Sequence, residues 1–170
     1  MKEVNEIKHN KNVHLGYIKW MRFILRRSDE VGKVELPITA VIIDDKGRCI
    51  GRGSNKRETN KDPLGHAELI ALRQAAWIKN DWRFNECSII VNLEPCTMCA
   101  AALVQARIGH VIYGAEDSKR GGFGGKTFSE DDQVLGRTIY VQRLDIRVVG
   151  SHRSGKWGAS RGSQEAVRDR

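Results

Sequence analysis

Two short motifs hold the residues of this sequence that could do chemistry together. A His-Ala-Glu motif occupies positions 66–68, and a Pro-Cys-x-x-Cys motif occupies 95–99 after 26 intervening residues. Cys96 and Cys99 are three positions apart just after a proline, which favours the first turn of a helix with both sulfurs on one side. Three protein ligands leave the fourth tetrahedral position of zinc open, as in catalytic sites. The sequence therefore predicts that His66, Cys96 and Cys99 bind a catalytic zinc ion.

Glu68 is the acidic residue of the first motif. It follows His66 by two positions, so on a helix its side chain points away from the imidazole. Zinc lowers the pKa of a bound water molecule, and a carboxylate beside that water can carry its proton. We interpret Glu68 as a proton shuttle. A purely structural zinc site is the weaker interpretation, because no fourth ligand is visible nearby; Cys49 and Cys87 are interpreted as plain buried cysteines.

Strands and helices alternate around the two motifs. The expected strands are 38–43, 48–52, 88–92, 111–113 and 144–149, the first two forming a hairpin across a turn at 44–47. The expected helices are an amphipathic segment at 13–28, a helix from the N-cap Asp62 and Pro63 to about Lys79, and a helix from Pro95 to Arg107 stopped by Gly109. Residues 51–62 are expected to be a polar loop, and 116–133 a mobile glycine-rich loop. Such alternation predicts an α/β sandwich with parallel strands.

The motifs and their surroundings resemble zinc nucleobase deaminases, whose signature is H-x-E…P-C-x-x-C. The similarity is greatest to bacterial-type tRNA-specific adenosine deaminases and extends over about residues 36–114. It is carried by LPITAV at 36–41, GSN at 53–55, DPLGHAE at 62–68, ALR at 71–73, LEPCTMCA at 93–100, RIG at 107–109 and YGA at 113–115. The resemblance implies a cytidine-deaminase-like three-layer sandwich, in which a mixed sheet of about five strands has helices on both faces.

The resemblance also implies an activity, hydrolytic deamination of adenosine to inosine at the wobble position of tRNA. His66, Cys96 and Cys99 would bind one Zn²⁺ per subunit. Zinc hydroxide would attack C6 while Glu68 moves the proton. Asn55 and the backbone N–H of Ala67 would orient the flipped-out base. The implied partners are the tRNA anticodon arm and a second copy of the chain, in a homodimer.

Two other functions stay open at this point. One is deamination of a free base or nucleoside of the guanine or cytosine type, and the other is a non-catalytic RNA-binding partner subunit of the same fold. Glu68 argues against the second, because a non-catalytic module needs no proton shuttle. Two departures from the family also matter: Thr39 stands where a glycine is expected near the pocket, and 151–170 lack the usual amphipathic helix.

Composition and charge set the wider frame. The chain has 170 residues, four cysteines and a net charge of +8, which favours an anionic partner and excludes a disulfide scaffold. Lys119, Arg120 and Lys126 are candidate contacts to the RNA backbone, while Trp77 and Trp82 are interpreted as core or dimer-surface residues.

No segment is apolar enough to span a membrane or to serve as a secretory signal, so we expect a cytoplasmic protein, with a plastid form as the alternative. The expected organisation is a flexible N-terminus at 1–12, a zinc deaminase domain at 13–150 and a disordered basic tail at 151–170.

Overall fold

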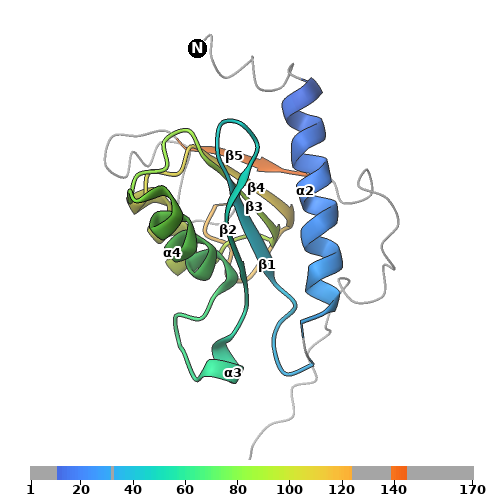
Figure 1. Ribbon diagram of the computed structural model, residues 1–170. Coiled ribbons are helices and arrows are strands. Elements are labelled where there is room, and N and C mark those ends of the chain that lie inside the picture. Colours follow the sequence, from blue (N-terminus) through green and yellow to red (C-terminus); the bar gives the residue numbers. More distant parts are fainter. Residues whose placement is uncertain (1–10, 32, 124–138, 145–170) are drawn as a thin grey trace, which may run out of the picture.

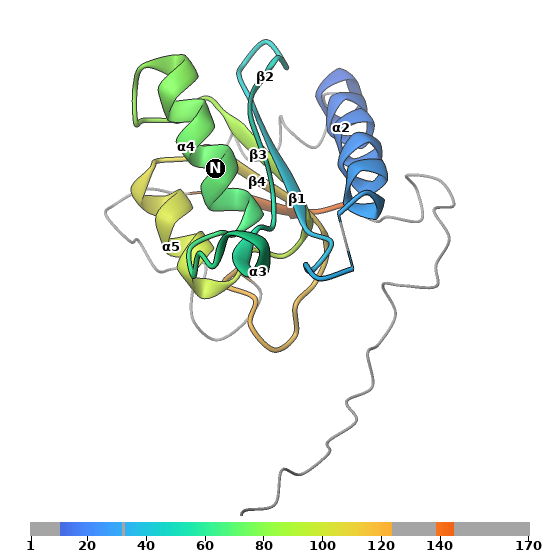
Figure 2. The ribbon, with the colours of Figure 1, turned by 60° about the horizontal axis from the view of Figure 1, so that its bottom comes forward.

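A five-stranded sheet lies between helices on both of its faces (Figures 1 and 2). The structure is a computed structural model that describes residues 11–31, 33–123 and 139–144. The strands are β1 (Thr39–Ile43), β2 (Cys49–Ser54), β3 (Ser88–Leu93), β4 (His110–Ala115) and β5 (Tyr140–Arg143). The helices are α2 (Lys11–Asp29), α3 (Arg57–Asn60), α4 (Ala67–Lys79) and α5 (Thr97–Gln105).

The sheet is mixed, with strand order β2-β1-β3-β4-β5. β1 pairs with β2 and with β3 in antiparallel fashion, whereas β3–β4 and β4–β5 are parallel pairs. α4 and α5 lie on one face of the sheet and α2 lies on the other, as the view in Figure 2 shows. The predicted three-layer α/β architecture is therefore confirmed.

Each face of the sheet has its own apolar core. Alternate residues of a strand point to opposite faces, so Ala40 and Ile42 of β1 pack with α4 while Val41 and Ile43 pack with α2. α2 brings Met21 and Ile24, both fully buried, to the second core. The helix-period pattern expected at 13–28 is confirmed, although α2 begins two residues earlier, at Lys11.

The helix that carries the His-Ala-Glu motif begins later than predicted. α4 starts at Ala67 with His66 as its N-cap residue, not at Pro63 with Asp62 as the cap. Asp62 instead forms a turn before the helix, because its carboxylate accepts the Leu64 N–H at 2.9 Å and its carbonyl accepts the Gly65 N–H at 3.0 Å. The true start places the imidazole at the first turn of α4.

The end of α5 also differs from the prediction. α5 ends at Gln105, and Arg107 rather than Gly109 adopts the left-handed backbone conformation, with φ of 60°. Gly109 is required for another reason: a Cβ there would lie 2.3 Å from the carbonyl oxygen of Asn85. The glycine thus permits a close backbone approach where a helix stop was expected.

Three further segments differ from the sequence prediction or lie partly outside the described residues. The last strand described is Tyr140–Arg143, ahead of the expected 144–149, of which 145–149 lie outside the described residues. The expected loop at 51–62 contains the end of β2 and the short helix α3. The expected flexible segment 1–12 loses its last two residues to α2, and 1–10 lie outside the described part, as does the tail 151–170. In the described part of the chain, no helix combines the length and apolar character needed to cross a bilayer.

Candidate active site

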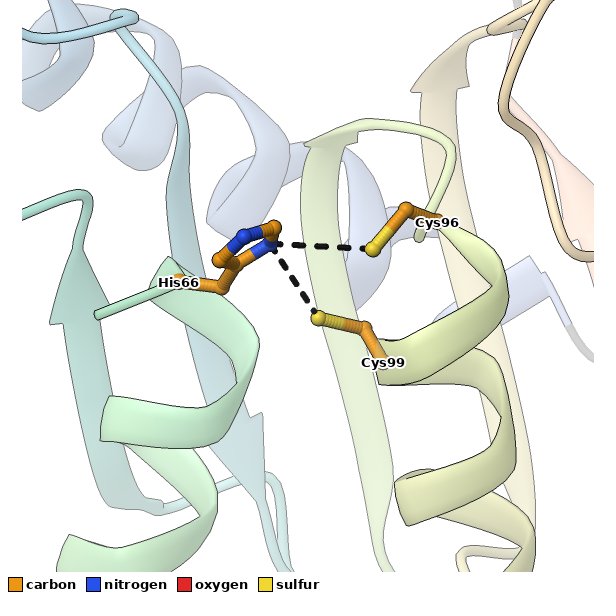
Figure 3. Close-up of side chains that lie close together, drawn as sticks. All are labelled: His66, Cys96 and Cys99. Carbon is orange, nitrogen blue, oxygen red and sulfur yellow. Dashed lines mark hydrogen bonds between the residues drawn. The ribbon is translucent and has the colours of Figure 1, made fainter. Parts of the chain in front are cut away.

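The first turns of α4 and α5 bring the three predicted zinc ligands together (Figure 3). His66 is the N-cap residue of α4, and Cys96 is the N-cap residue of α5, with Cys99 in the turn that follows. The imidazole Nδ1 lies 3.6 Å from the Cys96 sulfur and 3.5 Å from the Cys99 sulfur. Among the described residues, this is the single cluster of three histidine, cysteine or acidic side chains spaced to hold one ion.

These separations fit a shared zinc ion. Zinc lies about 2.3 Å from sulfur and about 2.0–2.1 Å from nitrogen, so tetrahedral ligands of the two kinds are about 3.6 Å apart. The observed nitrogen–sulfur distances of 3.5 and 3.6 Å match that value. The ring atom turned toward both sulfurs is Nδ1, which identifies the nitrogen available to the metal.

The local electrostatics favour a thiolate at this position. A hydrogen bond from the Cys99 thiol lowers the pKa of Cys96 to about 5. That bond raises the pKa of Cys99, because Cys99 holds the proton that the pair shares. The N-terminus of a helix stabilises a thiolate, and a bound metal ion would displace the remaining proton.

Glu68 is buried beside the cluster, with 3% of its surface exposed. Burial raises its pKa to about 7, and a hydrogen bond with Cys99 opposes that shift. Its Oε2 atom is fully buried and has no hydrogen-bond partner within the described structure. Because an unsatisfied carboxylate oxygen is costly to bury, this atom is placed for a group that the protein itself does not supply.

Asn55 is also buried, immediately after β2. Its Oδ1 accepts the backbone N–H of Ala67 at 3.0 Å, so the two residues predicted to orient the base are bonded to each other. This bond satisfies the first amide of α4 and fixes the side chain. The Asn55 Nδ2–H groups can donate to a base, and the Ala67 amide already has a partner.

Thr39 does not lie on the face of the sheet that carries the site. It shares the α2 side of β1 with Val41, and its hydroxyl is 3.2 Å from that of Ser54. This departure from the family therefore places its side chain on the opposite face of the sheet from the cluster. The expectation that Cys49 is buried is wrong, because its side chain is exposed. Trp77, expected either in the core or at a dimer surface, is 84% exposed and therefore lies at the surface.

The predicted RNA-backbone candidates Lys119 and Arg120 are exposed in a tight turn. Both backbone amides donate to the Asp117 carboxylate, at 3.1 and 3.0 Å. Lys126 lies outside the described residues.

Glu94 received no role in the sequence analysis, although a carboxylate between the end of a buried strand and a proline is unusual. In the structure it is 4% exposed and accepts two backbone N–H groups.

Comparison with known proteins identifies a matching family and relatives with two kinds of deaminase activity. Residues 15–155 match the family model of MafB19-like deaminases. The tRNA-specific adenosine deaminase of Haemophilus influenzae is 39% identical over 124 residues, which cover 72% of either chain.

Two solved structures share the fold. One comes from work on A-to-I editing by tRNA:A34 deaminases at the wobble position; it is 35% identical, has a TM-score of 0.67, and aligns with 73% of this chain and 95% of its own. The other is guanine deaminase from Bacillus subtilis, which is 33% identical with a TM-score of 0.54 over 61% of this chain and 64% of its own. The expected cytidine-deaminase-like fold is confirmed by these similarities.

Proposed function

This chain belongs to the MafB19-like deaminase family, and we propose that it converts adenosine to inosine at the wobble position of tRNA. The reaction is hydrolytic: a C6–O bond forms, the C6–N6 bond breaks, and ammonia leaves. The observation that carries the proposal is the buried Glu68 carboxylate beside the His66, Cys96 and Cys99 cluster. The choice of tRNA adenosine as substrate follows the relatives named above.

We propose that the cluster holds one zinc ion per subunit. The donor set of one imidazole and two thiols is typical of zinc, and its spacing and the unpartnered Glu68 oxygen both fit an ion with an open position. Zinc held there would act as a Lewis acid that makes a water molecule acidic enough to attack at neutral pH.

Glu68 is the proposed proton carrier. A carboxyl with a pKa of about 7 exchanges protons readily near neutral pH. It would accept a proton from the attacking water and deliver it to N1 of the purine. It would then take the proton of the new C6 hydroxyl group and give it to the departing amino group, which leaves as ammonia. Its burial would limit the exchange of these protons with bulk water.

Base and backbone contacts complete the proposed site. Asn55 would donate from Nδ2 to the purine, since its Oδ1 is bonded to Ala67. Exposed Lys119 and Arg120 would contact phosphates of the anticodon arm, and their fixed turn supports this role.

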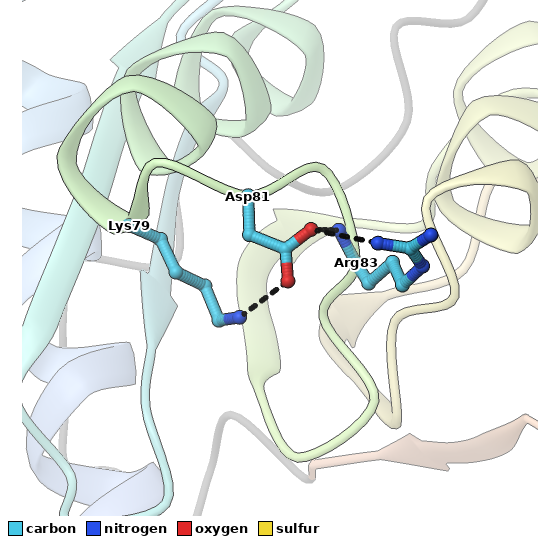
Figure 4. A network of polar contacts seen from close by, with 3 residues as sticks. All are labelled: Lys79, Asp81 and Arg83. Atoms are coloured by element: carbon cyan, nitrogen blue, oxygen red, sulfur yellow. Dashed lines mark hydrogen bonds and ion pairs between the residues drawn. The ribbon is translucent and has the colours of Figure 1, made fainter.

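We also propose that the chain forms a homodimer. The C-terminal end of α4 and the turn after it expose Trp77, Ile78 and Trp82, apolar side chains that an interface would cover. In the turn that bears Trp82, one carboxylate oxygen of Asp81 accepts a hydrogen bond from Lys79 and the other accepts one from Arg83 (Figure 4). These bonds help to fix the shape of the turn. A tRNA substrate is consistent with the cytoplasmic location expected from the sequence.

A second candidate function is deamination of free guanine, favoured by the likeness to the guanine deaminase of Bacillus subtilis. One substrate panel separates the two. Purified zinc-loaded protein is incubated with an anticodon stem–loop carrying adenosine at the wobble position, with guanine and with cytosine, and products are separated by chromatography. We expect inosine in the stem–loop alone. Conversion of guanine without conversion of the stem–loop would replace the proposal with the second candidate.

A further inference from the structure

Glu94 is a buried carboxylate that takes no part in the proposed proton transfers. It lies between the end of β3 and the Pro95-Cys96 turn, and its own backbone is fixed because its N–H donates to the Ala115 carbonyl at 2.8 Å. Its side chain points to the segment that follows β4. Oε2 accepts the Asp117 N–H at 3.2 Å, and Oε1 accepts the Phe123 N–H at 3.0 Å. One carboxylate therefore holds both ends of the segment 117–123, hereafter the clasp loop.

The clasp loop packs closely around this carboxylate. A Cβ on Gly121 would lie 2.4 Å from the Glu94 carboxylate atoms, so a larger residue there would force the carboxylate and the loop apart. Asp117 then builds the turn inside the loop, accepting the amides of Lys119 and Arg120 on its side chain and that of Gly121 on its carbonyl. The position of the two basic residues is thus set through Asp117 by Glu94.

The clasp loop also touches the turn that bears the zinc ligands. Gly121 pairs with Cys96 in an isolated β-bridge, and the Gly122 N–H donates to the Pro95 carbonyl at 2.8 Å. A Cβ on Gly122 would lie 2.6 Å from the Cβ of Ala100 in α5. These contacts are made by backbone, so they hold the ligand turn without the carboxylate. Loss of the carboxylate contacts would release the ends of the loop and leave the cluster intact.

We propose that Glu94 is a positioning residue for RNA binding: its carboxylate fixes the clasp loop so that Lys119 and Arg120 meet the phosphates of the substrate. This inference rests on the proposed function, since it takes the tRNA backbone as the ligand of the loop. A side chain that only positions a binding group affects substrate affinity and leaves the chemical step unchanged. The role therefore predicts a higher KM with an unchanged kcat.

Glu94→Gln tests the proposal, since glutamine has the same shape but turns an N–H group toward one of the two donor amides. Its KM for the anticodon stem–loop should rise about tenfold, because hydrogen bonds to a charged carboxylate are stronger than those to a neutral amide. The kcat and the zinc content should match those of the wild type. Hydrogen exchange at the Asp117 and Phe123 amides should become roughly tenfold faster or more.

Gly121→Ala is the second variant, because it keeps the charge of Glu94 while its methyl group separates the carboxylate from the loop amides. It should give the same KM and exchange changes. Glu116→Gln is the matched control, an exposed carboxylate one residue before the loop that pairs with Arg143. Its KM should be unchanged. A loss of zinc and kcat in Glu94→Gln, or exchange rates equal to those of the wild type in both variants, would overturn the proposal. The exchange readout does not depend on activity, so it tests Glu94 even if the stem–loop is not the substrate.

Discussion

Four side chains at the starts of two helices carry the proposed chemistry, and each has a distinct environment. Cys96 is a half-buried thiol with a lowered pKa, whereas Glu68 is a fully enclosed carboxyl with a raised one. The two shifts have opposite signs because Cys96 gains a hydrogen bond from Cys99, while burial of Glu68 penalises its charged form. The lowered pKa suits Cys96 to bind a metal as a thiolate, and the raised pKa suits Glu68 to carry a proton near neutral pH.

Removing one thiol should abolish metal retention. We expect Cys96→Ser to bind zinc roughly 100-fold more weakly or worse, because the hydroxyl stays protonated and three ligands become two. Zinc content after dialysis, measured by atomic emission, reports the change. Cys49→Ser is the control, since Cys49 is an exposed thiol that donates to the Gly51 carbonyl, as serine also can. Equal zinc loss in both variants would argue against the cluster.

The buried carboxyl of Glu68 predicts how stability depends on pH. Its folded pKa of about 7 lies above the ordinary value of 4.5, so the folded state holds the proton more tightly. In the metal-free protein, this stabilisation is present below pH 4.5 and is lost as pH rises toward 7. Relative to Glu68→Gln, the wild type should lose roughly 3 kcal/mol of unfolding free energy over that range. Urea unfolding of both metal-free proteins at several pH values measures the difference. A difference that stayed constant with pH would contradict the burial of Glu68.

At the scale of elements, the site depends on how closely α4 approaches the hairpin. A Cβ on Gly53 of β2 would lie 2.2 Å from the Ala67 carbonyl oxygen, and one on Gly51 would lie 2.3 Å from the Ala71 carbonyl oxygen. The two glycines therefore allow α4 to lie directly on β2, with His66 and Glu68 at its start. Any substitution that moves α4 also moves one ligand relative to the two on α5.

Gly53→Ala should accordingly lower the free energy of unfolding. The added methyl group forces α4 away from the sheet, and overpacking of this kind destabilises by about 1–3 kcal/mol. Thermal unfolding should show a lower Tm, and the zinc affinity should fall because His66 shifts. The control is Gly16→Ala, in the middle of α2, where a Cβ would meet nothing within 4 Å. That variant should gain about 0.5–1 kcal/mol, and a Gly53→Ala protein as stable as the wild type would contradict the close packing.

The sequence predicted these elements well where a single local pattern decides them. The β-branched run before the Asp44–Gly47 turn identified the hairpin, and helical spacing identified α2. Residues 62–66 were misassigned because Asp62-Pro63 fits a helix cap as well as the isolated turn that it forms. The role of Gly109 was missed because its neighbour Asn85 is distant in sequence, and the same holds for Glu94 and Phe123. Contacts between distant segments are not visible in local patterns.

At the scale of the whole molecule, the positive charge is unevenly distributed. Of the net charge of +8, residues 151–170 contribute +3, from five basic and two acidic residues, and the other 150 contribute +5. Charge alone therefore does not locate an RNA site. Lys119 and Arg120 are exposed basic residues in the loop that contacts the Pro95-Cys96 turn, which makes them more specific candidates than the net charge does.

Binding of the anticodon stem–loop should therefore depend on salt through these two residues. The double variant Lys119→Ala and Arg120→Ala should reduce the slope of log Kobs against log salt by about 1–2, as expected for two lost phosphate contacts. Fluorescence anisotropy at several salt concentrations measures the slope. The charge-matched control replaces Lys19 and Arg22 on α2, across the sheet from the site. Equal slope changes in the two double variants would indicate general attraction in place of specific contacts.

The proposed role of Glu68, proton transfer during deamination of the wobble adenosine, can be tested by one paired measurement. Inosine formed in the anticodon stem–loop is quantified for zinc-loaded wild type and for Glu68→Gln, with zinc content measured on the same samples. We expect inosine from the wild type, one zinc ion per subunit in both proteins, and a loss of about 100-fold or more in turnover for the variant. A zinc-loaded Glu68→Gln protein that formed inosine at the wild-type rate would contradict this role.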